Sequence, residues 1–146
     1  MKKAFTLVEL LVVISIIALL FSIAAVSYSR FVKQGRNARR KSDIEQVRAA
    51  IELYRNFNGV YPTPGTPGMA FGTGSIADAT STYMSRIPQD PVSTGSTAKT
   101  YFYTSPGPSY MDYTLCAFIE GGDTSVTTEL CGAAECNYCM GPYGQK

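Results

Sequence analysis

A single carboxylate, that of Glu9, stands inside an otherwise apolar run near the start of the chain. From residue 5 to residue 26 the other polar side chains are the hydroxyls of Thr6, Ser15 and Ser22. An ionised carboxylate in hydrocarbon costs about 2.5 to 3.5 kcal/mol and therefore needs a partner or a function. The nearest candidate partner for this charge is an amine.

Four cysteines form the second group of residues that could do chemistry: Cys116, Cys131, Cys136 and Cys139. They allow three disulfide pairings, between which the sequence does not choose. The spacing of Cys136 and Cys139 also fits a redox motif or half of a zinc site. Because Cys116 and Cys131 lack that spacing and the chain has no His, we expect structural disulfides, each stabilising the fold by about 2 to 4 kcal/mol, and no metal site.

Catalytic chemistry is not indicated by the rest of the chain. The acidic residues beyond residue 57 are scattered singly and there is no His, so no general acid and base can be paired. Residues 72–75, Gly-Thr-Gly-Ser, have the glycines of a phosphate loop but lack its Lys and a preceding strand. We therefore expect a protein that is not an enzyme.

The apolar run predicts a helix that begins in a membrane. Residues 5–26 supply about 20 apolar positions, enough to cross a bilayer at about 1.5 Å per residue. Beyond them, apolar residues recur at spacings of three and four, as on one helix face: Ile44, Val47, Ile51 and Tyr54. Asn58-Gly59 is typical of a helix end, which gives one helix over residues 5–57 with Gly35 as a candidate hinge.

Only the second half of such a helix, about 80 Å long in total, has a domain of its own chain to pack on. The first half projects, and a projecting apolar helix must be covered by lipid or by copies of itself. The sequence therefore predicts polymerisation.

From residue 61 onward the composition changes to turns and short strands. All eight prolines lie in this part, and residues 61–74 are typical of a loop. Residues 77–87 are predicted to form a short helix with Asp78 as its cap. Strands are predicted over three ranges: 101–104, 110–119 and 124–130. The predicted fold class is α+β.

The charges are divided unevenly along the chain. Residues 30–57 carry eight basic and three acidic side chains, whereas residues 58–146 carry three basic and seven acidic ones. One interpretation is a solvated face. A second is a contact between the basic helix of one subunit and the acidic domain of another, which would include Arg39 and Arg40. Separately, Arg48 and Glu52 are expected to form an i,i+4 pair of opposite charge that supports the helix. Nucleic-acid binding is less favoured, because a basic cluster also suits acidic lipid headgroups.

The residues that surround Glu9 carry a resemblance to a known family. Lys2-Lys3-Ala4 followed by Phe5-Thr6-Leu7-Val8-Glu9 resembles the processing site of type IV prepilins and type II secretion pseudopilins. The resemblance implies cleavage between Ala4 and Phe5, methylation of the new amine of Phe5, and pairing of Glu9 with the amine of a neighbouring subunit. Ala4 departs from the family's usual Gly.

Three loop segments are similar to those of the major, G-type pseudopilin: residues 58–63, 86–91 and 103–107. Val92-Ser93 replaces the family's usual Trp-Gly, and a cysteine-containing tail replaces its Asp-rich calcium loop. The resemblance implies a long helix packed on a small antiparallel sheet. It divides the chain into a cleaved leader (1–4), a transmembrane or filament-core helix half (5–29), an amphipathic helix half (30–57) and a disulfide-bonded β head (58–146). Calcium is implied by the family but is not supported by this tail.

The function that the resemblance implies is a structural subunit of a type IV pilus or pilus-like filament, a homopolymer assembled through the N-terminal helix. The alternative is a major pseudopilin forming a short periplasmic pseudopilus. A third interpretation is a membrane-anchored binding or redox module. Partners implied by the family are a prepilin peptidase and methyltransferase, an inner-membrane assembly platform and its ATPase.

The expected location is the cytoplasmic membrane as a single-pass precursor, then the cell surface or, for a pseudopilus, the periplasm. Four cysteines favour an oxidising compartment for the head, and prepilins insert with the leader inside. The basic residues after the apolar run oppose this topology by the positive-inside rule, and we give them less weight.

Overall fold

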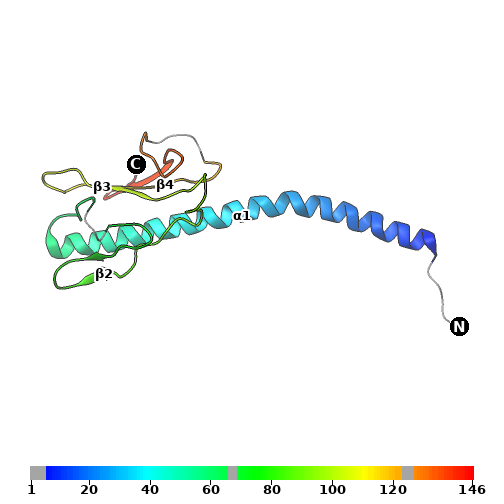
Figure 1. The fold of residues 1–146 in the computed structure, drawn as a ribbon, viewed down its shortest axis with the longest axis horizontal. Helices are drawn as coiled ribbons and strands as arrows, with labels where there is room; N and C mark the ends of the chain where they lie inside the picture. Colours follow the sequence, from blue (N-terminus) through cyan, green and yellow to red (C-terminus); the bar gives the residue numbers. More distant parts are fainter. Residues whose placement is uncertain (1–5, 66–68, 123–126) are drawn as a thin grey trace. The chain divides into compact units, whose positions relative to one another are not determined.

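The computed structural model describes residues 6–65, 69–122 and 127–146. The chain divides into two compact units, residues 1–35 and residues 36–146, and we call the second unit the head. One long helix, α1 (Leu7–Asn58), contributes to both units. In these described ranges the remaining elements are six short strands in the head, and Figure 1 shows them following α1 along the chain. The α+β fold class predicted from the sequence is confirmed.

Helix α1 has the length that the apolar periodicity predicts. It continues through Gly35, the predicted hinge, and ends at Asn58. Gly59 has a left-handed backbone with φ +75°, and its N–H donates to the carbonyl oxygen of Arg55 at 2.7 Å. A glycine adopts this conformation without the steric cost of a Cβ atom. The helix therefore ends at Asn58-Gly59, as the sequence predicts. The predicted start at Phe5 lies outside the described residues.

A four-stranded antiparallel sheet packs on the part of α1 that lies in the head. Its order is β3-β4-β5-β6, with β3 at Phe102–Thr104, β4 at Thr114–Ala117, β5 at Tyr138–Gly141 and β6 at Gly144–Gln145. Ile44, Val47 and Ile51 of α1 are fully buried and share one core with Leu115 and Ala117 of β4. The face of α1 predicted from the spacing of apolar residues is therefore the face that packs.

Two strands occupy the place of the predicted helix over residues 77–87, so that prediction is wrong. β1 (Ile76–Ala77) and β2 (Thr82–Met84) form an antiparallel hairpin. Asp78 does not cap a helix but makes a turn, because its carboxylate accepts the backbone N–H groups of Thr80 and Ser81, both at 2.7 Å. The run from Thr82 contains a β-branched residue and an aromatic one, which favour a strand.

The other predicted strands are partly wrong. The expected strand over 101–104 is present as β3, but that over 110–119 is shortened to β4. Residues 124–126 lie outside the described residues, and Thr127 to Glu129 form no strand. On the side of β4 away from β3 the paired strand is β5, with Leu115 opposite Met140 and Cys116 opposite Cys139.

Two buried tyrosines contact Glu52, a residue that was predicted to form an i,i+4 pair with Arg48. Its carboxylate accepts hydrogen bonds from the hydroxyls of Tyr113 at 3.1 Å and Tyr61 at 3.2 Å. Burial raises the pKa of Tyr113 above its ordinary value of 10.0, so this hydroxyl stays a donor. Arg48 lies 3.6 Å from Glu45, so the predicted pairing of Arg48 with Glu52 is replaced by an i,i+3 pair.

Candidate functional site

The N-terminal end of α1 is organised by Thr6 and Glu9. The Glu9 carboxylate accepts hydrogen bonds from the backbone N–H and the hydroxyl of Thr6, both at 2.8 Å. In return, the Thr6 hydroxyl oxygen accepts the backbone N–H of Glu9 at 3.2 Å. This reciprocal arrangement is a capping box, which satisfies N–H groups that the first helical turn leaves without partners. Within a single chain, Glu9 therefore stabilises the start of its own helix.

The T-x-x-E pattern of residues 6–9 is visible in the sequence, so the role of Thr6 could have been predicted from it. The capping box places a negative charge at the positive end of the helix dipole, where it is stabilising. Ala4 and Phe5, the residues predicted to flank the cleavage site, lie outside the described residues. Leader cleavage, methylation of Phe5 and its pairing with Glu9 therefore stay predictions.

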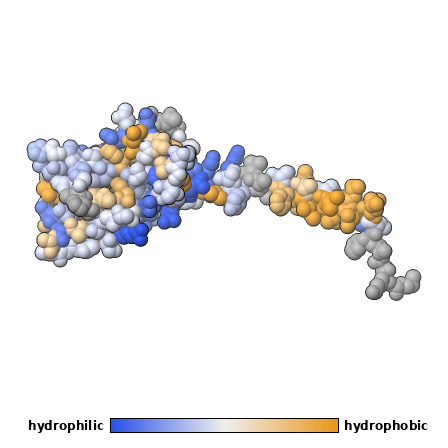
Figure 2. All heavy atoms as spheres, viewed as in Figure 1, coloured by the Kyte–Doolittle hydropathy of each residue, from blue (hydrophilic) through white to orange (hydrophobic). Residues whose placement is uncertain are grey.

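The apolar side chains that follow Glu9 have no cover within the described part of the chain. From Leu7 to Ile23 every residue is exposed, and Figure 2 shows the hydrophobic side chains gathered on this part of α1. By length and composition this stretch is able to cross a membrane. A soluble monomer rarely exposes so large a contiguous apolar surface, which marks an interaction site for lipid or protein.

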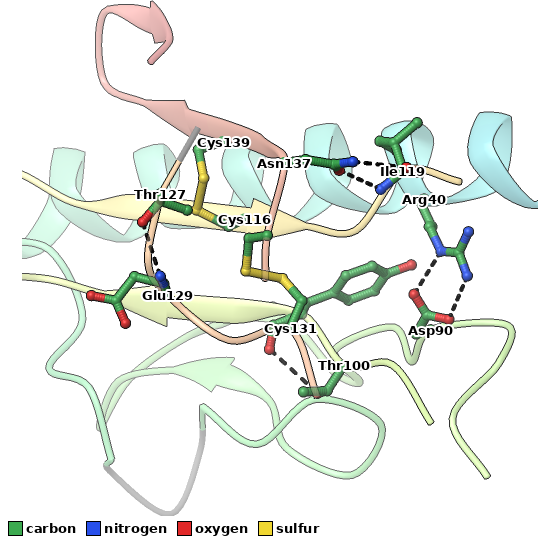
Figure 3. Close-up of a disulfide and its surroundings, with 12 residues drawn as sticks. Arg40, Asp90, Thr100, Cys116, Ile119, Thr127, Glu129, Cys131, Asn137 and Cys139 are labelled. Atoms are coloured by element: carbon green, nitrogen blue, oxygen red, sulfur yellow. Dashed lines mark hydrogen bonds and ion pairs between the residues drawn. A yellow bond between two sulfur atoms is a disulfide. The ribbon is translucent and has the colours of Figure 1, made fainter. Parts of the chain in front are cut away.

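Two disulfides bring the four cysteines of the tail together in the head. Cys116 pairs with Cys139 across β4 and β5, and Cys131 pairs with Cys136 within a short loop. All four are buried, with Phe102 and Phe118 packed against them; Figure 3 shows Cys116, Cys131 and Cys139 in this cluster. Cys136 and Cys139, whose spacing also fits a redox motif or half of a zinc site, are not bonded to each other. Cys136 is bonded to Cys131, and Cys139 is bonded to Cys116. In this state all four sulfurs are engaged, and none is a thiolate ligand.

Removing the bridge between Cys116 and Cys139 is expected to destabilise the head more than removing the other one. The bridged residues are separated by 23 positions for Cys116 and Cys139 but by 5 for Cys131 and Cys136. Loop-closure entropy then predicts losses of about 3 and about 2 kcal/mol, respectively, for paired Cys→Ser variants. Urea unfolding followed by circular dichroism measures both; equal losses, or a larger one at Cys131 and Cys136, would contradict this account.

An ion-pair cluster, buried at Arg40 and Asp90 and partly buried at Arg36 and Glu120, fixes α1 to two loops of the head. Arg40, which has no solvent exposure, donates from Nε to Asp90 Oδ2 at 2.7 Å and from Nη2 to Oδ1 at 3.0 Å. Figure 3 shows this two-point contact. Nη1 of Arg40 donates a hydrogen bond to Glu120 Oε1 at 2.9 Å, and Nε of Arg36 donates to the same oxygen at 2.7 Å. We call Arg36, Arg40, Asp90 and Glu120 the arginine clamp.

Polar neighbours complete the clamp. Asn37 donates to the backbone carbonyl oxygen of Glu120 and accepts the backbone N–H of the same residue, both at 2.9 Å. Asp90 accepts the backbone N–H of Val92 at 2.7 Å. Among the described residues, no buried side-chain polar atom is left without a hydrogen-bond partner. A buried ion pair with such complete hydrogen bonding fixes one geometry, which here sets where α1 meets the two loops.

The clamp changes the interpretation of the uneven charge distribution. Arg40 was expected to meet the acidic head of another subunit, but it is buried and paired within its own chain. Arg36 and the acids Asp90 and Glu120 are likewise engaged internally. The prediction is therefore wrong for Arg40, and a contact between subunits through exposed charges such as Arg39 stays a prediction.

Acid is expected to weaken the head through Glu120. Hydrogen bonds from Arg36, and then from Arg40, lower the pKa of Glu120 from 4.5 to about 2. Because the folded-state pKa is lowered, this stabilisation is complete above about pH 4.5 and is lost as the pH falls toward 2. The free energy of unfolding should therefore fall over this interval, and the fall should be smaller in Glu120→Gln. An identical pH profile for that variant and the unmodified protein would contradict the assignment.

Comparison with known proteins agrees with both parts of this arrangement. Residues 1–25 match the prokaryotic N-terminal methylation motif, and residues 28–130 match the type II secretion system (T2SS) protein G family. No curated protein and no solved structure matches the chain.

An N-terminal methylation motif, an exposed apolar helix capped by Glu9 and a small α+β head together define a structural subunit of the pilin or pseudopilin class. The chain belongs to the type II secretion system protein G family. The resemblance stated from the sequence is thereby confirmed. Both families consist of structural subunits rather than enzymes.

Proposed function

We propose that this protein polymerises through its N-terminal helix into a type IV pilus or pilus-like filament after its leader is removed. The observation that carries the proposal is the apolar stretch of α1, which is exposed from Leu7 to Ile23. Burying apolar surface gains about 25 cal/mol for each Å² removed from water. Outside lipid, contact between copies is the source of that burial.

In this proposal a prepilin peptidase cleaves between Ala4 and Phe5, and the new amine of Phe5 is methylated. Glu9 then leaves its contacts with Thr6 and pairs with the amine of a neighbouring copy. A subunit in the wrong register would bury an unpaired charge, which is strongly unfavourable. The precursor spans the cytoplasmic membrane with its head outside the cytoplasm, where disulfides persist. An assembly platform and its ATPase extract it into the filament.

A second candidate is a short periplasmic pseudopilus that acts in type II secretion. The match of residues 28–130 to protein G of that system favours it. Calcium is not part of either proposal, because a disulfide-bonded tail stands where the family's Asp-rich loop is expected. Assembly of this chain should therefore proceed equally well after treatment with a calcium chelator.

The experiment that tests the proposal combines imaging with mass measurement. Surface appendages are isolated from cells that express the chain, imaged by electron microscopy and analysed by intact mass. The expected main protein begins at Phe5, carries one added methyl group and contains two disulfides. Surface fibres support a pilus, whereas filaments confined to the periplasm and lost secretion after gene deletion support the pseudopilus. A full-length, detergent-free and stably monomeric product would refute both.

A further inference from the structure

The turns of α1 that follow the apolar stretch carry two basic side chains without an acidic partner. Arg30 and Lys33 are exposed, and within the described part of the chain none of the ion pairs includes either of them. The sequence has no Asp or Glu between Glu9 and Asp43. Because like charges three residues apart on a helix are neighbours and repel each other, an anion beside Arg30 and Lys33 would stabilise both. We call these two residues the basic pair.

Two aromatic side chains lie on the same turns of α1 as the basic pair. Tyr28 is 73% exposed and Phe31 is 69% exposed. With 3.6 residues per turn, these two rings share one side of the helix and the basic pair occupies the other. Aromatic rings gather at the level of the lipid headgroups, and long basic side chains lay their stems along hydrocarbon while the charge stays at the interface. The combination is typical of the place where a helix leaves a bilayer.

The spacing along α1 agrees with the dimensions of a bilayer. From Leu7, where the helix begins, to Tyr28 the rise is about 32 Å at about 1.5 Å per residue, and the hydrocarbon core is about 30 Å thick. Arg30 and Lys33 follow about 3 and 8 Å beyond Tyr28, and the headgroup region adds about 5 to 8 Å on each side of the core. When the apolar stretch spans the core, the basic pair therefore lies at the level of the headgroups.

We propose that the basic pair binds the phosphate of an anionic phospholipid in the leaflet through which α1 leaves the membrane. The inference rests on the membrane-spanning precursor of the proposed function and deepens it, because it names the class of lipid that the precursor contacts. The guanidinium of Arg30 donates two parallel N–H hydrogen bonds to a phosphate, and the ammonium of Lys33 supplies a second charge. A zwitterionic lipid has the same phosphate, but its own cation cancels the charge that attracts the pair.

This contact also gives a physical reason why a basic segment is tolerated outside the cytoplasm. The positive-inside rule counts Arg30 and Lys33 against the proposed topology. An anionic lipid that binds the basic pair on the outer side stabilises both charges there, and the opposing bias is reduced by that amount.

Photo-crosslinking of the precursor in vesicles tests the inference. Gln34 is exposed and stands four residues after Arg30, on the same side of the helix. It is replaced by p-benzoyl-phenylalanine in the full-length, uncleaved chain. The vesicles contain phosphatidylglycerol and phosphatidylcholine in equal amounts and with identical acyl chains. Intact mass after irradiation gives the ratio of the two lipid adducts, and we expect phosphatidylglycerol adducts to predominate.

Three double variants that carry the same probe show which charges set this ratio. One basic charge near an anionic surface contributes about fivefold to association, so Arg30→Gln with Lys33→Gln should lower the ratio by about 30-fold. Arg30→Lys with Lys33→Arg keeps both charges and should keep the preference. Arg39→Gln with Lys41→Gln removes two exposed charges of the head, and it should change the ratio by less than about twofold, because the screening length is about 10 Å.

The outcomes separate the inference from the proposed function, because the vesicles contain no filaments. Equal amounts of the two adducts, a fall of less than about fivefold in the Arg30→Gln, Lys33→Gln variant, or an equal fall in the head variant overturns the inference alone. If the unmodified precursor stays outside both this bilayer and one of pure phosphatidylcholine, measured by extraction at alkaline pH, the membrane stage of the proposed function is wrong and the inference falls with it.

Discussion

Replacing Arg40 with methionine is expected to cost about 3 to 5 kcal/mol of head stability. The substitution leaves the carboxylate of Asp90, which is 2% exposed, without the cation that it binds at 2.7 and 3.0 Å. A buried charge without a partner is among the few defects that destabilise a small domain on this scale. Near-ultraviolet circular dichroism in urea reports the loss, because every tyrosine except Tyr28 lies in the head.

Two control variants show whether the effect belongs to the buried pair. Arg39→Met removes the neighbouring arginine, whose side chain is 66% exposed, and should change the free energy of unfolding by less than about 0.5 kcal/mol. Arg40→Met combined with Asp90→Asn removes both charges while keeping an acceptor for the backbone N–H of Val92. That double variant should recover part of the loss. Equal effects of Arg39→Met and Arg40→Met would show that the clamp does not stabilise the head.

The helix was predictable because its signals are local and repeat over many residues. Ile44, Val47 and Ile51 recur at helical spacing and are fully buried, and Gly59 ends the helix in the left-handed conformation. Arg40 stands four residues before Ile44 and seven before Val47, so it lies in phase with the apolar face. A charged residue in that phase predicts a buried partner, but its partners are 50 and 80 residues away along the chain.

The β1–β2 hairpin was missed because its turn is specified by one side chain. Ala77 to Ile87 contains residues with moderate helix propensity, and Asp78 is a favoured residue at helix starts and at turns alike. The choice was made by contacts that local sequence does not specify. The Asp78 carboxylate also accepts hydrogen bonds from Tyr83 and from Asn58 at the end of α1. The hydrogen bond from Tyr83, the largest cause, lowers the pKa of Asp78.

The disulfide pairing was beyond sequence reasoning for a related reason. Cys116 and Cys139 are bonded because β4 and β5 lie side by side with these residues directly opposite. The strand that contains Cys139 was not predicted at all, and a third strand was expected over 124–130 instead. Pairing across a sheet depends on which strands are neighbours, and that is a property of the whole fold.

Loss of filaments is expected when Glu9 is replaced by alanine or by glutamine. The structure gives Glu9 two separate functions, since its carboxylate caps its own helix through Thr6 and, in our proposal, binds the amine of Phe5 in a neighbouring copy. Glutamine retains the capping hydrogen bonds but removes the charge, because Gln as well as Glu serves in a capping box. Alanine removes both functions.

If the charge sets the contact between copies, both variants should fail to assemble, by about 30-fold or more in filament yield, because truncating one partner of a buried charge pair costs about 2 to 5 kcal/mol or more. If Glu9 is only a cap, Glu9→Gln should assemble normally and Glu9→Ala should lose less than about 2 kcal/mol. Ser15→Ala, a change to another polar side chain of the same apolar stretch, is the control that should assemble in either case.

Filament yield by sedimentation and leader cleavage by intact mass are measured together, since only a variant that is cleaved before Phe5 tests assembly. Normal filaments from cleaved Glu9→Gln would refute the ion pair and leave the apolar surface of α1 as the driving force.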